Sequence, residues 1–155
     1  MTVHAAFAHR GAAVQLVHNL KYRRSKAAGT FLATAMAERL PEGVDVLVPI
    51  PRVLVRRIGH GIDQTGVLAA SLSKLTGIPV SNALNAPLWH RRLAGTPNRG
   101  RVASRFSNVG SISGRILLID DVCTTGSTIV SAARALGSTE VSALVATATG
   151  PSRLR

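Results

Sequence analysis

The sequence contains few residues of several kinds, and each scarcity excludes a class of protein. Its 155 residues include one cysteine, Cys123, so a disulfide framework and a cysteine-rich zinc site are both excluded, and a reducing, cytoplasmic compartment is expected. No apolar run approaches the roughly 20 residues that a membrane-spanning helix needs, so we expect no membrane partner. The first ten residues lack a basic start followed by an apolar block, which argues against a secretion signal.

Acidic residues are also scarce. Seven Asp and Glu stand against nineteen Lys and Arg, sixteen of them arginine, which gives a net charge of +12. This charge implies an anionic partner, namely a phosphorylated metabolite, a nucleic acid or an anionic surface, and composition does not choose among them. A hydrophobic fraction of 46% with 17% charged residues excludes a disordered chain, and the length favours one domain over residues 1–155.

The hydrophobic periodicity predicts helices alternating with apolar strands. Residues 1–43 are expected to form a helical N-terminal part, which Pro41 and Gly43 end. Asp63 is expected to cap a helix with the apolar stripe Val67, Leu68, Leu72 and Leu75. The remaining expected elements are strands at 44–48, 78–84, 116–119 and 141–148, a helix at 127–136, and a long loop over 91–114.

Strands that are apolar throughout and alternate with helices predict an α/β fold. Its mostly parallel central sheet would be covered by helices on both faces. Ligands of such sheets bind at the carboxyl ends of the strands, so the residues that follow each strand are the first candidates for a site.

The segment after the strand at 116–119 carries the clearest chemistry. It runs Asp120-Asp121-Val122-Cys123-Thr124-Thr125-Gly126-Ser127-Thr128 and then enters the helix. Hydroxyl residues and a glycine at a helix N-terminus favour a phosphate, while the two carboxylates suit sugar hydroxyls or water-bound Mg²⁺. The combination predicts a ribose 5-phosphate site. The alternative is that the acids are solvated and the hydroxyl residues only cap the helix. No Gly-Lys-Ser/Thr follows, and Gly126 lacks partner glycines, so P-loop and dinucleotide motifs are excluded.

The whole string from Ile116 to Thr128 resembles the phosphoribosyl pyrophosphate (PRPP) motif of type I phosphoribosyltransferases. The resemblance implies the type I phosphoribosyltransferase fold, with a PRPP-binding core over residues 44–148. It implies Mg²⁺-dependent transfer of ribose 5-phosphate from PRPP to an unknown nitrogenous acceptor, with release of pyrophosphate. Asp120 and Asp121 would bind the ribose, and residues 122–128 the 5-phosphate. Cys123, at a variable position of the motif, is expected to be a small packing residue.

Two further elements are similar to the ComF family of competence proteins within this group. These elements are Leu20-Lys21-Tyr22 and Val48-Pro49-Ile50-Pro51, the second of which is followed by arginines. Family members often begin with a four-cysteine zinc segment, and their Arg-Gly-Phe-Asn-Gln element is His60-Gly61-Ile62-Asp63-Gln64 here. The resemblance implies a monomer or a dimer, and a role in DNA uptake.

The resemblance also implies roles for several basic residues, according to their position in the fold. By resemblance, Ile50, Pro51 and Arg52 would hold pyrophosphate, although Arg52 on so basic a chain could equally be a surface residue. The loop arginines would form a flexible lid over the substrate, with a disordered loop or a nucleic-acid contact as alternatives. These arginines are Arg91, Arg92, Arg99, Arg101 and Arg105.

Two functions from different classes therefore stand open. The first is a phosphoribosyltransferase. The second is a non-enzymatic competence protein that binds single-stranded DNA, in which PRPP binding would be regulatory or vestigial. The net charge of +12 suits a DNA partner, but the few aromatic residues offer little surface for stacked bases.

Overall fold

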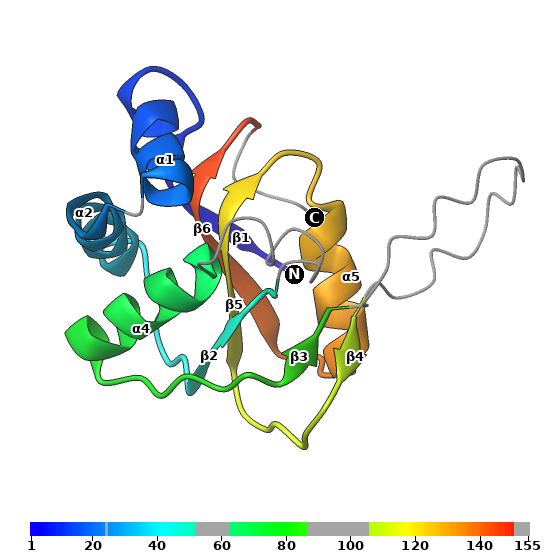
Figure 1. The fold of residues 1–155 in the computed structure, drawn as a ribbon. Coiled ribbons are helices and arrows are strands. Elements are labelled where there is room, and N and C mark those ends of the chain that lie inside the picture. Colours follow the sequence, from blue (N-terminus) through cyan, green and yellow to red (C-terminus); the bar gives the residue numbers. More distant parts are fainter. Residues whose placement is uncertain (24, 52–62, 87–105, 151–155) are drawn as a thin grey trace, which may run out of the picture.

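A four-stranded parallel sheet lies at the centre of the protein (Figure 1). The structure is a computed structural model and describes residues 1–23, 25–51, 63–86 and 106–150. Neighbouring strands are parallel throughout, and beyond β2 Leu47 also makes a parallel bridge to Val80. The strand order is β1 (Val3–Ala8), β6 (Val141–Ala148), β5 (Ile116–Cys123) and β2 (Val46–Pro49).

Helices cover both faces of this sheet, as Figure 1 shows. One face carries α1 (Ala12–Tyr22), α2 (Lys26–Ala37) and α4 (Gln64–Thr76), which pack on the side chains of Leu117, Ile119 and Leu144. The other face carries α5 (Ser127–Leu136), which packs on Ile116, Leu118 and Val145. Alternate residues of β5 thus enter opposite apolar clusters, as the pleat of a strand requires. The sheet confirms the predicted α/β class.

The N-terminal part differs from the expectation of helix alone. Val3–Ala8 is the edge strand β1 and pairs with β6 from Val3↔Ala143 to Ala8↔Ala148. Its alanines favour helix locally, but the edge of β6 offers a row of backbone partners that outweighs this preference. The helical prediction holds for α1 and α2, which follow the strand.

Other predicted elements agree with the structure within a few residues. The helix at 127–136 and the strand at 141–148 have the predicted bounds, and Asp63 caps α4 by accepting a hydrogen bond from the Gly66 N–H. The predicted apolar stripe of α4 is wrong at Val67 and Leu75, which are exposed. Leu68, Ala69 and Leu72 are buried instead, because α4 turns that face toward α2 and the sheet.

The strand expected at 78–84 is reduced to the bridge at Val80, and a short hairpin follows it. There β3 (Leu84–Asn85) pairs antiparallel with β4 (Ser107–Asn108). The loop predicted for 91–114 lies partly outside the described residues, and its described end contains β4 and the buried Phe106. Within the described ranges, no helix is long and apolar enough to cross a membrane.

Candidate functional site

Strand β5 extends four residues further than its apolar pattern predicts. Asp120 pairs with Val145, Val122 with Thr147, and Cys123 with Ala148, so both acids lie inside the ladder with β6. The polar segment between strand and helix is therefore short, comprising only residues 124–126. This segment lies at the carboxyl end of the sheet, where α/β proteins bind ligands.

The loop over residues 124–126 is shaped to receive an anion. Gly126 adopts a left-handed conformation with φ 73°, occupies the N-cap of α5, and has no side chain to cap the first N–H groups of the helix. Thr124, Thr125 and Ser127 are exposed, and Thr125 Oγ1 lies 3.2 Å from Ser127 Oγ. Hydroxyl groups and helix N–H groups thus gather at the positive end of the helix dipole.

Thr149, the residue that follows β6, holds the start of this loop. The Thr149 N–H donates to the Cys123 carbonyl at 3.0 Å, and the Thr149 hydroxyl donates to the Thr124 carbonyl at 3.4 Å. These two bonds hold the backbone of Cys123 and Thr124, just before Gly126.

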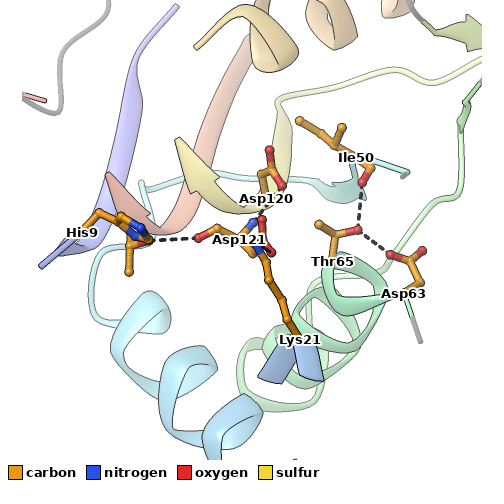
Figure 2. A network of polar contacts seen from close by, with 8 residues as sticks. His9, Lys21, Ile50, Asp63, Thr65, Asp120 and Asp121 are labelled. Atoms are coloured by element: carbon orange, nitrogen blue, oxygen red, sulfur yellow. Dashed lines mark hydrogen bonds and ion pairs between the residues drawn. The ribbon is translucent and has the colours of Figure 1, made fainter. Parts of the chain in front are cut away.

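The two acids occupy different environments. Asp121 is buried, and its Oδ2 lies 2.9 Å from Lys21 Nζ of helix α1 (Figure 2). Asp120 is half-buried, and its Oδ1 accepts a hydrogen bond from the Asp121 N–H at 2.8 Å. The ion pair directs the Asp121 side chain toward α1. The motif by itself does not distinguish these two environments.

A polar chain behind Asp121 joins three strands at their carboxyl ends. The Thr147 hydroxyl lies 2.7 Å from His9 Nδ1 and 3.4 Å from the Asp121 carbonyl oxygen. The backbone N–H of His9 also donates to the Ala148 carbonyl at 2.7 Å. No pattern near His9 in the sequence predicts this contact. His9 meets Thr147 because β1, which His9 follows, pairs with β6.

On the other side of β5, the end of β2 is held by the start of α4. The Ile50 N–H donates to the Ile119 carbonyl at 3.0 Å, and the Ile50 carbonyl accepts from the Thr65 hydroxyl at 2.8 Å. Asp63 Oδ1 lies 2.7 Å from the same hydroxyl (Figure 2). Ile50 is buried and Pro51 is partly exposed.

The predicted basic residues lie outside the described part of the chain. This applies to the pyrophosphate candidate and to the five arginines of the long loop, which are Arg52, Arg91, Arg92, Arg99, Arg101 and Arg105. The structure therefore brings together the acids, residues 122–128 and the pair Ile50 and Pro51 at the carboxyl ends of β5 and β2.

Cys123 is a buried packing residue at this edge. Burial and the neighbouring Asp120 carboxylate raise the pKa of the Cys123 thiol, and a backbone hydrogen bond from Gly126 offsets only part of this effect. The thiol therefore stays protonated near neutral pH, which suits a packing role.

The oxygen ligands at the site would suit a Mg²⁺ ion that is bound jointly with a polyphosphate. Among the described residues, no group of three or more His, Cys, Asp or Glu side chains could form a metal site. The Lys21 ammonium already compensates Asp121, and Asp120 is half-buried. Mg²⁺ commonly binds through one or two carboxylates together with phosphate oxygens and water, so Asp120 with a polyphosphate ligand would satisfy it.

The architecture matches solved structures of known enzymes. Glutamine PRPP amidotransferase from B. subtilis, solved with ADP and GMP, aligns over 78% of this chain with a TM-score of 0.56 and 23% identity. The fold is that of the type I phosphoribosyltransferases. The structure described as the allosteric regulatory enzyme of purine biosynthesis gives the same values, and the matched region spans 26% of either enzyme.

Other comparisons add little to this result. UMP synthase from Leishmania donovani aligns over 84% of this chain and 24% of its own, with 18% identity and a TM-score of 0.46. No model of a known protein family matches the sequence, and no curated protein sequence matches it. The phosphoribosyltransferase fold therefore rests on the first two structures together with the sheet order and the loop after β5.

Proposed function

We propose that this protein binds PRPP and transfers its ribose 5-phosphate to a nitrogenous acceptor. The observation that carries the proposal is the exposed hydroxyl loop over residues 124–126, which joins β5 to the N-terminus of α5 beside Asp120. A phosphate held at a helix N-terminus, with a carboxylate a few residues away, matches the two ends of a ribose 5-phosphate.

Each part of the motif has a task in this proposal. The backbone of residues 122–126 and the hydroxyl groups of Thr124, Thr125, Ser127 and Thr128 hold the 5-phosphate. The carboxylates of Asp120 and Asp121 orient the sugar, Asp120 by accepting hydrogen bonds from its hydroxyl groups. Ile50, Pro51 and Arg52 follow β2 in the sequence. The pyrophosphate would bind there, on the opposite side of β5 from the phosphate loop.

The reaction itself asks little covalent chemistry of the protein. The bond from ribose C1 to the pyrophosphate oxygen breaks, and its electron pair leaves with pyrophosphate. The acceptor nitrogen forms the new bond to C1 and gives its proton to water or to the pyrophosphate that leaves. Mg²⁺ bound to PRPP would neutralise the charge that gathers on pyrophosphate, and arginines would assist it. Neither acid needs to act as a general base.

Calorimetric titration with PRPP and Mg²⁺ tests the site. Wild type should bind PRPP in a Mg²⁺-dependent manner, and Asp120→Asn/Asp121→Asn should lose this binding. Glu140→Gln is the matched control, because Glu140 is an exposed acid at the opposite end of the sheet, before β6. If wild type does not bind, or if the double variant binds equally well, the site assignment is wrong.

Release of pyrophosphate across a panel of purine, pyrimidine and amine acceptors tests the transfer. A protein that binds PRPP but releases no pyrophosphate with any acceptor would be a PRPP-binding protein rather than a transferase of these acceptors.

The resemblance to the ComF family and the charge of +12 support a second candidate, a competence protein that binds single-stranded DNA. Its affinity should fall steeply with salt, because each phosphate contact releases counterions. A gel-shift experiment at low and moderate salt checks this, and absence of binding at low salt would exclude the DNA role.

A further inference from the structure

His9 lies at the carboxyl edge of the sheet, and in the described part of the chain only one of its two ring nitrogens is bonded. It follows β1 directly and is partly exposed. Its Nδ1 lies 2.7 Å from the hydroxyl oxygen of Thr147, which is buried. The backbone N–H of His9 donates to the Ala148 carbonyl, so the residue is held at both its backbone and its ring. One nitrogen therefore anchors the ring, and Nε2 is available to a ligand.

The contacts of Thr147 favour one tautomer of this ring. The Thr147 hydroxyl has a single proton and lies 3.4 Å from the Asp121 carbonyl oxygen, which can only accept. Both contacts of the hydroxyl are hydrogen bonds at once only when His9 Nδ1 donates to it. The neutral imidazole then carries its proton on Nδ1 and a lone pair on Nε2. Nε2 is thus a hydrogen-bond acceptor.

The strand order places His9 on the side of β5 from which an acceptor would approach. In the proposed reaction the ribose lies at the end of β5, and pyrophosphate leaves at the end of β2. A nitrogen that bonds to C1 as pyrophosphate leaves comes from the opposite side, where β6 and β1 lie. Neighbouring strands are about 4.8 Å apart, so the backbone of His9 lies about 10 Å from β5. A nucleobase and the His9 side chain together can bridge that distance.

The geometry points to His9 as an acceptor-binding residue, whose Nε2 accepts a hydrogen bond from an N–H of the acceptor. This inference rests on the proposed function and narrows its substrate class to acceptors that carry an N–H group, as nucleobases do. An acceptor whose only nitrogen is of the pyridine type has no proton to donate to Nε2. A site built around a hydrogen bond discriminates against a molecule that cannot make it, because a polar atom of the site is then left unpaired.

His9→Asn tests this contact by kinetics. The Asn amide can still donate to Thr147, but it has no group at the position of Nε2. Its KM for adenine or uracil in the pyrophosphate-release assay should rise about tenfold, while its calorimetric affinity for PRPP stays at the wild-type value. His4→Asn is the matched control, because His4 lies near the opposite end of the same strand. A merely structural effect of His9→Asn would lower the PRPP affinity as well.

¹⁵N NMR of protein labelled at histidine gives a second readout, which needs no turnover. At about pH 8.5, where a histidine side chain is ordinarily neutral, the His9 ring should show a protonated Nδ1 and an unprotonated Nε2. In Thr147→Val the anchor is absent, so the proton should be shared between both nitrogens. With Mg²⁺ and pyrophosphate present, adenine or uracil should shift the Nε2 resonance of wild type, and nicotinic acid, which has no N–H, should not. The spectrum of His9→Asn identifies the resonance by its absence.

The outcomes separate the two proposals. If wild type binds no PRPP, the proposed function and this inference fail together. If wild type binds PRPP, the inference fails alone when the ring proton is on Nε2, when neither adenine nor uracil shifts the Nε2 resonance, or when His9→Asn keeps the wild-type acceptor KM. If wild type transfers ribose 5-phosphate to none of these probes, the NMR titration decides. Loss of PRPP affinity in His9→Asn but not in His4→Asn would mean that His9 serves the PRPP site, which also overturns the inference.

Discussion

Neighbouring residues of β5 have different chemistry because they face different layers of the molecule. Asp121 is paired with Lys21 of α1, while Cys123 belongs to the apolar cluster on the α5 side. A buried ion pair adds little net stability compared with apolar residues of similar volume, but a single partner left alone is costly.

The thiol of Cys123 should react slowly in the folded protein. Burial and the Asp120 carboxylate raise its pKa, so little thiolate is present near neutral pH, and the side chain is 7% exposed. Iodoacetamide should therefore modify the native protein much more slowly than the urea-unfolded protein. Mass spectrometry of timed samples measures both rates, and equal rates would contradict the burial.

The same pKa shift predicts a pH dependence of stability. Above about pH 8.5 the unfolded chain releases the thiol proton before the folded one does, so the free energy of unfolding falls as pH rises toward the folded pKa. Cys123→Ala lacks this contribution. Its urea midpoint should therefore decline less than that of wild type over the alkaline range, with no such difference near neutral pH.

At the scale of elements, the turn from β5 into α5 is the feature on which the proposed PRPP binding depends. Gly126 provides the left-handed conformation at the N-cap, and Gly137 provides the same conformation at the C-cap, with φ 68°. Both ends of α5 thus require the same backbone geometry, but only its N-terminus presents N–H groups. Substitutions at Gly126 and Gly137 therefore separate the effect of backbone strain from an effect on ligand binding.

Gly126→Ala should weaken both folding and PRPP binding, whereas Gly137→Ala should weaken folding alone. Each adds a Cβ at positive φ, which costs about 1–2 kcal/mol, and nothing lies within 4 Å of a Cβ at Gly137. Chemical denaturation and PRPP titration on the two variants measure the effects. Equal losses of PRPP affinity would show that helix stability, and not the N-terminal loop, controls binding.

At the scale of the whole molecule, the N-terminal residues complete the core. Residues 1–43 supply β1, which closes one edge of the sheet, and the helices α1 and α2, which cover one of its faces together with α4. Leu32 and Met36 are fully buried against the face that Leu117, Ile119 and Leu144 form. The division into a helical part over 1–43 and a binding core over 44–148 is thus a division of sequence, with one shared core.

A fragment of residues 44–155 should not fold as the intact chain does. Its sheet would expose the side chains that α1 and α2 cover, and large exposed apolar areas drive aggregation. Circular dichroism and binding of a hydrophobic dye measure this. The full chain is the control, and a fragment with a cooperative unfolding transition and little dye binding would contradict the shared core.

The sequence alone determined those features that depend on neighbours along the chain. The apolar runs predicted β2, β5 and β6, Asp63 predicted the cap of α4, and the motif predicted a short polar loop before α5. Each of these follows from backbone preferences and side-chain patterns within about ten residues. The resemblance carried by the motif likewise led to the correct fold.

Only the tertiary structure decided which distant residues meet. The alanines of Val3–Ala8 suggest helix until the edge of β6 is available, and Val67 is exposed because packing, not periodicity, selects the buried face of α4. Lys21 and Asp121 are a hundred positions apart, so no local pattern links them. This long-range contact gives Asp121 an environment that Asp120 does not share, because only the folded chain brings α1 to the end of β5.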